Sequence, residues 1–247
     1  MPKRDKADRT QRDWLKGAWR FLLVLDAARP DYVRQLDRRF EEVDALGGIT
    51  HTWCANLWQL VPKRMTYFSA NPVTAWKQQR VKAPHVEMID VWRHCWRRFG
   101  KWKVGSVHPA DLNAFVLDWL KAHEMPKRVV VHYLQPHAPY IVKGLPVQCG
   151  NLHDGPTGKK GDLSVVDAIE RGLMTWDDLR EAYMANLKLV LATALELCGE
   201  LREHGEVIIT ADHGEVLGEK GLFGHARMPA GLIRRVPLWS TAWEDKP

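Results

Sequence analysis

The sequence feature that most constrains the fold is the alternation of short apolar runs with longer segments of helical spacing. The apolar runs contain β-branched or aromatic residues, as buried strands require, and they lie at 21–25, 65–70, 129–134, 207–210 and 236–240. Between them, the segments 110–123 and 178–204 repeat apolar side chains every three or four residues. Strands joined by helix-length connections predict an α/β fold, a three-layer α/β/α sandwich with a mostly parallel central sheet.

The length of the chain fits one large domain preceded by a short charged segment. The 247 residues have 45% hydrophobic content, which is enough to build a substantial core. Residues 1–16 are rich in Lys, Arg and Asp, a pattern found in nucleic-acid-binding arms but more often in solvated tails. We therefore predict a flexible basic segment at 1–16 and a single folded domain at 17–247.

The charge of the chain favours anionic partners. The formal net charge is +6 and the pI is about 9.2. A positive net charge favours binding of phosphate or sulfate esters, nucleic acid or an acidic membrane surface, and it does not distinguish among these partners.

Cysteine spacing and apolar run lengths bear on the compartment. Cys54, Cys95, Cys149 and Cys198 form no Cys-x-x-Cys pair, which is typical of reduced thiols rather than disulfides or a zinc ribbon. No run approaches the roughly 20 apolar residues of a membrane span, and the N-terminus lacks the apolar core of a signal peptide. We predict a cytoplasmic protein without a transmembrane segment, and the oligomeric state is left open.

Titratable side chains follow three of the predicted strands. Asp26 comes directly after the first strand, His137 follows the run at 129–134, and Asp212 and His213 follow the run at 207–210. Because ligand sites in parallel sheets lie beyond the carboxyl ends of the strands, we expect these side chains to converge. Carboxylate and imidazole ligands suit Zn, Mn, Mg or Ca, and a bound cation would balance buried carboxylates. Gly214 and Gly224 give the backbone room to bring His225 back toward this site.

These residues lie in stretches that resemble the alkaline phosphatase superfamily, in particular its sulfatase-like and phosphodiesterase-like branch. The matching stretches are "VLDAARPDY", "HYLQPHAPY" and "TADHGEVLGEKGLFGH", followed by "VPLW", and together they cover most of the chain in the family's order. The resemblance implies an α/β/α sandwich and a metal-dependent hydrolase or transferase that acts on phosphate or sulfate esters. At this length the chain would be a minimal member, with 17–247 as its catalytic domain.

The resemblance also implies roles for individual residues. Asp26, Asp212 and His213 would bind the principal metal together with the nucleophile. His137 and His225 match positions that contact the anion of the substrate or a second metal, and we expect His225 among the metal ligands and His137 among the substrate-binding residues. One metal is expected and a second is possible, although its only acidic candidate is Asp154 beside His153.

The nucleophile is predicted in the stretch "GGITHTWCANLWQL", where the family places a hydroxyl at the start of a helix. Thr50 and Thr52 are both candidates, and Thr50 is slightly favoured because it resembles relatives with a hydroxyl just ahead of a Trp. Cys54 lacks the Cys-x-Pro-Ser-Arg sequence of formylglycine sulfatases. A metal-held threonine oxygen would attack the ester and form a phospho-threonine intermediate.

Several residues keep a structural interpretation beside the functional one. Arg29 is a candidate substrate contact, but Arg29 and Asp31 equally suit an ion pair. We expect His51, His132 and His153 to be structural. The loop 143–160 is a predicted lid over the site.

The sequence also suits a second function, in which the same scaffold has lost catalysis and binds nucleic acid or an acidic partner. It rests on the Trp-rich basic segment 91–103, "VWRHCWRRFGKWK". Inward packing of these Trp residues is the favoured interpretation, and nucleic acid is therefore a possible but not a favoured partner.

Overall fold

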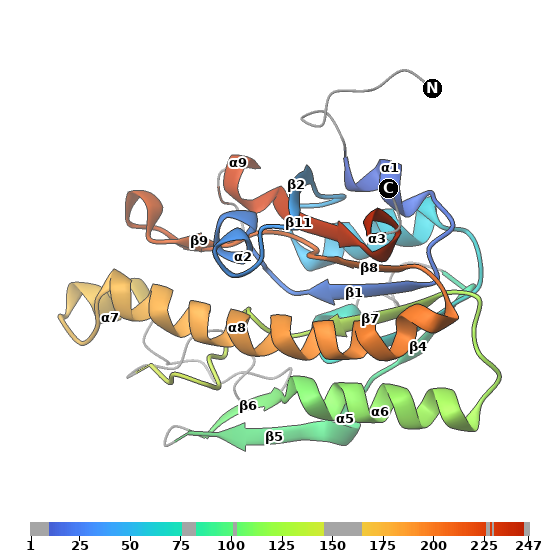
Figure 1. The fold of residues 1–247 in the computed structure, drawn as a ribbon. Helices are drawn as coiled ribbons and strands as arrows, with labels where there is room; N and C mark the ends of the chain where they lie inside the picture. The colour runs from blue at the N-terminus through green and yellow to red at the C-terminus, as the bar shows by residue number, and fades with distance from the viewer. Residues whose placement is uncertain are drawn as a thin grey trace.

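A seven-stranded sheet forms the centre of the protein (Figure 1). The computed structural model describes residues 10–75, 83–100, 103–145, 165–225, 228 and 230–244. The strand order is β2-β11-β8-β1-β7-β3-β4, and β11 runs antiparallel to β8 and β2 while the pairs from β8 to β4 are parallel. The strands are β1 (Phe21–Leu25), β2 (Glu41–Asp44), β3 (Met65–Ser69), β4 (Val86–Ile89), β7 (Val129–Tyr133), β8 (Val207–Thr210) and β11 (Arg235–Ser240).

The described helices flank this sheet, and the two predicted helical segments are confirmed. The segment 110–123 forms α6 (Pro109–Ala122), and 178–204 forms most of α8 (Trp176–Leu201) and the 3-10 helix η2 (Arg202–His204). Thr175 caps α8, since its hydroxyl accepts from the Asp178 N–H. The remaining helices are α1 (Gln11–Leu15), α2 (Pro30–Leu36), α3 (Thr50–Leu60), α5 (Trp92–Cys95), α7 (Val165–Glu170), α9 (Ala230–Ile233), η3 (Glu219–Gly221) and η4 (Thr241–Trp243).

Successive side chains of the central strands contact different helix layers. In β3, Tyr67 packs edge-on against Trp58 of α3, whereas Phe68 packs against Trp119 of α6. Because neighbouring residues of a strand point to opposite faces, α3 and α6 cover opposite faces of the sheet. β1, β3 and β7 are buried along their whole length. The predicted three-layer α/β/α sandwich is therefore confirmed.

Two edge elements of the sheet were not predicted. β2 has the sequence "EEVD" and β4 has "VEMI", and both are only partly buried. A short strand at an edge needs few apolar residues, so its sequence lacks a continuous apolar run. The small ribbons β5 (Trp96–Phe99) with β6 (Val104–Val107) and β9 (Val216–Leu217) with β10 (Phe223–Gly224) lie outside the main sheet.

The N-terminal boundary differs from the prediction. Residues 1–9 lie outside the described residues, but α1 belongs to the folded domain rather than to a flexible segment. Gln11 is fully buried, and its amide nitrogen donates to the Thr210 hydroxyl at 2.9 Å and to the Ala211 carbonyl at 2.8 Å. Its amide oxygen accepts from the indole of Trp53 at 2.7 Å. The predicted segment 1–16 is thus too long, because a polar residue in it is part of the core.

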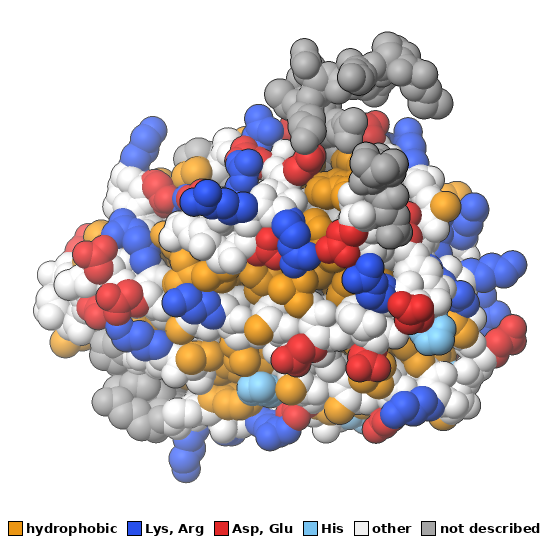
Figure 2. All heavy atoms as spheres, viewed as in Figure 1, with side chains coloured by type: hydrophobic (Ala, Val, Ile, Leu, Met, Phe, Trp, Pro, Cys, Tyr) orange, Lys and Arg blue, Asp and Glu red, His pale blue; other side chains and the backbone are white. Residues whose placement is uncertain are grey.

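The Trp-rich segment forms α5 and β5 and packs inward where it is described. Trp92 is buried, and Arg93 and Arg97 form ion pairs with Asp90 and Asp111. Lys101 and Trp102 lie outside the described residues, as does most of the predicted lid, including His153 and Asp154. On the face shown in Figure 2, basic and acidic side chains are interspersed.

Candidate metal centre

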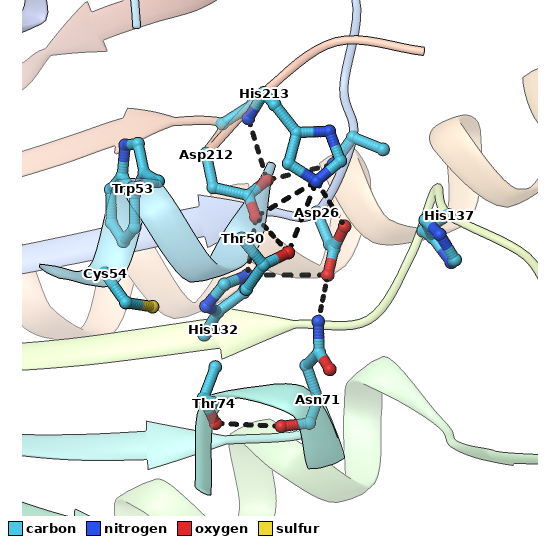
Figure 3. A network of polar contacts seen from close by, with 12 residues as sticks. Asp26, Thr50, Trp53, Cys54, Asn71, Thr74, His132, His137, Asp212 and His213 are labelled. Atoms are coloured by element: carbon cyan, nitrogen blue, oxygen red, sulfur yellow. Dashed lines mark hydrogen bonds and ion pairs between the residues drawn. The ribbon is translucent and has the colours of Figure 1, made fainter. Parts of the chain in front are cut away.

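Three neighbouring strands and one helix bring the candidate residues together. Asp26 follows β1, Asp212 lies two residues beyond the end of β8, and His132 is the next-to-last residue of β7. Because β8, β1 and β7 are adjacent and parallel, their carboxyl ends meet at one edge of the sheet. Thr50 is the first residue of α3 and points into the same cluster (Figure 3). The predicted convergence is present for Asp26 and Asp212. The β7 residue that joins them is His132 and not the predicted His137, which follows that strand.

The hydroxyl of Thr50 lies between Asp212 and His213. Its Oγ1 donates to Asp212 Oδ2 at 2.8 Å and lies 3.2 Å from His213 Nε2. The helix N-terminus at Thr50 carries unpaired N–H groups and a partial positive charge, which favour negative charge there. Thr52 instead donates to the Ile49 carbonyl at 3.0 Å and is exposed. Of the two candidate hydroxyls, the structure brings only that of Thr50 to the cluster.

The ring of His213 presents a lone pair to the cluster. Its Nδ1 lies 2.8 Å from the Gly214 carbonyl oxygen, which accepts hydrogen bonds only, so Nδ1 carries the proton. Nε2 is therefore unprotonated in the neutral ring, and it lies 3.6 Å from Asp26 Oδ1 and 3.4 Å from Asp212 Oδ2. Gly214 is required for this geometry, because a Cβ there would lie 2.3 Å from the Leu232 carbonyl oxygen.

His132 belongs to the cluster, although we expected it to be structural. Its Nε2 lies 3.7 Å from Asp26 Oδ2 and 3.7 Å from Asp212 Oδ2, and its side chain is fully buried. On the other side of the ring, Nδ1 is 2.6 Å from the hydroxyl of Tyr67. Asn71 is a further unpredicted member, because its amide nitrogen donates a short hydrogen bond to Asp26 Oδ2.

The two buried carboxylates have shifted pKa values of opposite sign. Burial, reinforced by the charge of Asp212, raises the pKa of Asp26 well above its usual value. Burial also opposes ionisation of Asp212, but His213 and His132 outweigh it and lower the pKa of Asp212. Burial lowers the pKa of His132 to about 4 and also lowers the pKa of His213. Both rings are therefore neutral near pH 7 and do not balance the carboxylate charge.

A divalent cation fits this set of residues. Asp26 Oδ1 and His132 Nε2 are buried and have no hydrogen-bond partner among the described residues. Asp26, His132 and Asp212 each offer a ligand atom, and these atoms lie within 4.8 Å of one another. In the described part of the chain, the ion pairs of Asp26 and Asp212 involve histidines and no Lys or Arg. A cation would satisfy the orphaned atoms and the charge together.

A second cluster lies beside the first and contains His137, Glu215 and His225. His225 Nδ1 is 3.0 Å from Glu215 Oε1, and His137 Nε2 is 3.9 Å from Glu215 Oε2. The ring of His225 lies 4.2 Å from that of His213 between centroids, so the clusters are adjacent. Both predicted histidines are thus near the site, and His225 joins His137 rather than the cluster of Asp26 and Asp212.

Glu215 is the acidic residue of this second cluster that the sequence prediction missed. It is 1% exposed, and although burial opposes its ionisation, His225 above all lowers the pKa of Glu215. Conversely, Glu215 overcomes the effect of burial and raises the pKa of His225. Burial lowers the pKa of His137. The signal for Glu215 was its place directly after Asp-His-Gly, in the loop that carries the ligands.

Arg29, a predicted substrate contact, is held by acidic side chains of the protein. Its Nη2 is 2.7 Å from Asp31 Oδ2, its Nη1 is 2.5 Å from Glu219 Oε1, and its Nη1 also donates to the Glu215 carbonyl at 3.1 Å. The residue is 6% exposed. The guanidinium is therefore engaged by protein groups, and it fixes the loop that carries Glu215.

Comparison with known proteins identifies the fold. No family model and no curated protein matches the sequence. The integral membrane lipooligosaccharide phosphoethanolamine transferase A (EptA) from Neisseria meningitidis is similar, with 15% identity, a TM-score of 0.58 and coverage of 92% of this chain. This chain spans only 49% of that protein. For its soluble domain the values are 14% identity, a TM-score of 0.59 and coverage of 96% of this chain and 80% of that one.

Two further solved structures have the same architecture. The periplasmic domain of phosphoethanolamine transferase EptC from Campylobacter jejuni is 14% identical with a TM-score of 0.55, covering 97% of this chain and 82% of that one. Phosphonate monoester hydrolase from Silicibacter pomeroyi is 15% identical with a TM-score of 0.52, covering 94% of this chain and 69% of that one. The chain therefore has the α/β fold of these enzymes, which is the fold that the resemblance to the alkaline phosphatase superfamily implied.

Proposed function

We propose that the protein is a metal-dependent hydrolase or transferase of phosphate esters with Thr50 as its nucleophile. The observation that supports this proposal best is the position of the Thr50 hydroxyl, 2.8 Å from Asp212 Oδ2 and 3.2 Å from His213 Nε2 at the start of a helix. Neither threonine caps α3, whose N-cap is Ile49, and Thr52 donates within its own helix to the Ile49 carbonyl. A hydroxyl directed at a buried carboxylate and imidazole instead suits an activated nucleophile.

The first cluster supplies the residues that would hold the cation. Asp26, Asp212 and His213 are the predicted ligands, and Nε2 of His132 would add a fourth ligand atom. A cation bound there would stabilise the ionised hydroxyl of Thr50 and the charge of the attacked ester. Asp212 Oδ2 already accepts the Thr50 hydroxyl proton in a hydrogen bond, so it orients the oxygen for attack.

The covalent step follows from the position of Thr50. Its hydroxyl loses a proton and its oxygen forms a bond to phosphorus as the bond from phosphorus to the leaving oxygen breaks. The leaving oxygen takes up a proton and departs as an alcohol, and Thr50 keeps the phosphorus group of the substrate as an ester. Water or an acceptor alcohol then forms a new bond to phosphorus, and the Thr50 oxygen leaves.

The partly exposed rings of His137 and His225 lie beside the cluster. Glu215 outweighs burial, raises the pKa of His225 and holds its Nδ1, so the protonated ring of His225 would donate from Nε2 to an ester oxygen. Nδ1 of His137 faces the Ala138 carbonyl, so His137 would contact the substrate without donating from Nε2.

Esters of phosphorus are favoured over sulfate esters. The similar structures named above are phosphoethanolamine transferases and a phosphonate monoester hydrolase. In addition, Cys54 is fully buried, and it lacks the sequence of a formylglycine precursor. We therefore infer a phosphodiester or phosphonate monoester substrate, with transfer to an alcohol and hydrolysis as the two fates of the intermediate.

The alternative function, nucleic-acid binding by a catalytically inactive scaffold, gains no support from the described Trp-rich segment. Trp92 is buried, and the carboxylates of Asp90 and Asp111 neutralise Arg93 and Arg97. Cytoplasmic localisation stays a prediction. Among the described residues, no helix has the length and apolar character needed to cross a bilayer.

The proposal is tested by metal content and turnover of matched variants. The protein, reconstituted with Zn, Mn, Mg or Ca, is assayed with aryl phosphodiester, phosphonate monoester, phosphomonoester and sulfate substrates. Asp212→Ala should lose bound metal, and Thr50→Val should lower kcat/KM on the order of 10³-fold or more while metal remains bound. Intact-mass spectrometry after a rapid quench should detect the mass of the substrate's phosphorus group, with the substituent that it keeps after the leaving alcohol is lost, in the wild type and no such addition in Thr50→Val.

Thr52→Val is the matched control, because it removes a hydroxyl of the same kind from the same helix, two residues after Thr50. It should retain activity within a few-fold, at about the scale of a lost local hydrogen bond. Equal loss of activity in the two variants would contradict the assignment of Thr50. Absence of metal under every loading condition would contradict the catalytic function itself.

A further inference from the structure

A cluster of basic residues lies at the end of the sheet opposite the metal centre. Lys63 and Arg64 directly precede β3, and Lys127 and Arg128 directly precede β7. The first residues of these strands are aligned, since Thr66 pairs with Val129. Because parallel neighbouring strands begin at the same edge, the two basic pairs meet there, at the end where the arrow of the parallel strand β1 starts in Figure 1.

These residues line a cavity together with the segment that leads into β1. The cavity has a volume of about 520 Å³ and is lined by Ala18, Trp19, Lys63, Arg64, Lys127 and Arg128. Its size falls in the range of small-molecule sites, about 300–1,000 Å³. Among the described residues that line it, none is acidic. The cavity is therefore large enough for a small ligand, and four of its six described lining residues are basic, namely Lys63, Arg64, Lys127 and Arg128.

Arg128 is the buried member of this cluster, and only part of its guanidinium is hydrogen-bonded to described residues of the protein. It is 7% exposed, and its guanidinium carbon lies 4.3 Å from the centroid of the Trp19 ring. Its Nη2 donates to the Gly17 carbonyl at 2.8 Å, whereas Nη1 has no partner in the described part of the chain. A buried guanidinium nitrogen without an acceptor is unfavourable, and an anion is the group that would satisfy it.

The surrounding cations are also available to an anion. Lys63, Arg64 and Lys127 are exposed, and none of the ion pairs found between described residues includes them or Arg128. Elsewhere basic side chains have acidic partners, such as Arg39 with Asp37 and Arg97 with Asp111. The lack of such partners here distinguishes this cavity from the mixed charge of the face in Figure 2.

We propose that this cavity binds a phosphate group, separately from the metal centre. The planar fork of an arginine suits the paired oxygens of a phosphate, and lysines add point charges around it. Trp19 fixes the Arg128 guanidinium in place through its ring face. The phosphate belongs either to a soluble ligand or to an anionic lipid headgroup, which share the same recognition chemistry.

The test measures phosphate binding to the chelator-treated protein, in which the metal centre cannot hold the probe through a cation. Pyrophosphate binding is followed by calorimetry, and vesicle binding is followed by sedimentation with phosphatidylcholine vesicles with and without phosphatidylglycerol. The variant Lys63→Gln/Lys127→Gln should weaken binding about tenfold, because two charges that face the cavity are lost. Both residues are exposed, so the variant should fold normally.

The matched control is Arg34→Gln/Lys188→Gln, which removes the same charge from exposed positions on α2 and α8. It should change the dissociation constant by less than about twofold. Arg128→Lys keeps the charge but removes the fork, and it should weaken pyrophosphate binding if it folds. Binding of pyrophosphate alone assigns a soluble ligand, and binding of phosphatidylglycerol vesicles alone assigns a lipid headgroup. Equal effects of the two double variants, or no binding of either probe to the wild type, would overturn the proposal.

Discussion

The hydroxyl of Tyr67 lies 2.6 Å from Nδ1 of His132, on the side of the ring that faces away from the two carboxylates. If Nδ1 donates to Tyr67, Nε2 is left with a lone pair directed at Asp26 and Asp212. Outer hydrogen bonds of this kind fix the tautomer and orientation of a metal-binding histidine. Tyr67 is thus a positioning residue behind the proposed metal centre.

Tyr67→Phe should therefore weaken metal binding about 10-fold to 100-fold without changing the fold. The measurement is competition for Zn between the protein and a chelating indicator. Tyr133→Phe is the control, because Tyr133 is buried in the same strand as His132 but donates to Asn113 of α6. A loss of affinity of equal size in both variants would show that the effect is one of packing.

Asp26→Asn should stabilise the metal-free protein while it abolishes stabilisation by metal. Burial and the nearby Asp212 raise the pKa of Asp26, which means that its ionised form is unfavourable without a cation. The neutral amide removes this penalty, and we expect a gain on the order of 1 kcal/mol or more. Thermal unfolding with chelator and with added Zn or Mn measures both effects. A lower melting temperature of the chelated variant than of the chelated wild type would contradict this account.

The same raised pKa predicts a pH dependence of stability. The folded metal-free protein keeps the proton on Asp26 at pH values where the unfolded chain, with a pKa of about 3.9, has lost it. Its stability should therefore fall as pH rises from about 4 through the raised pKa. Subtracting the urea unfolding free energies of Asp26→Asn from those of the wild type isolates this contribution. A difference that is constant with pH would show that Asp26 has no raised pKa.

Glu215→Gln tests the second cluster separately from the first. The change keeps the shape of the side chain but removes the charge that holds the rings of His225 and His137. We expect the metal at Asp26 and Asp212 to remain, any second ion to be lost, and kcat/KM to fall about 10-fold to 100-fold. Metal content by elemental mass spectrometry gives the stoichiometry. Glu219→Gln is the control, because Glu219 pairs with Arg29 and with no histidine.

Much of the site could be predicted from the sequence because it lies at strand ends. The runs before Asp26 and Asp212 are apolar on both faces, as in the strands of a parallel sheet. Because sites in such sheets lie beyond the carboxyl ends of the strands, the two carboxylates are predicted to lie together at that edge. Glu215 and His132 were missed for a physical reason. Whether a buried polar side chain faces the cluster depends on the orientation of its strand or loop, which local sequence does not determine.

The choice between Thr50 and Thr52 also needed the structure. The two residues are separated by about 200° around a helix, so they cannot face the same way, but the sequence does not tell which one faces Asp212. The helix start at Thr50 and its contact with Asp212 decide their orientation. The edge strands β2 and β4 escaped prediction because half-exposed strands need few apolar residues.

The buried amide of Gln11 connects the beginning of the chain to two of the segments that form the cluster. Its nitrogen holds the carbonyl just before Asp212, and its oxygen holds the indole of Trp53, three residues after Thr50. One glutamine side chain therefore links the loop that carries Asp212 to the helix that carries Thr50. Trimming the chain back beyond Gln11 would remove this link and should change the distance between the Thr50 hydroxyl and Asp212, although no residue of the cluster itself had been altered.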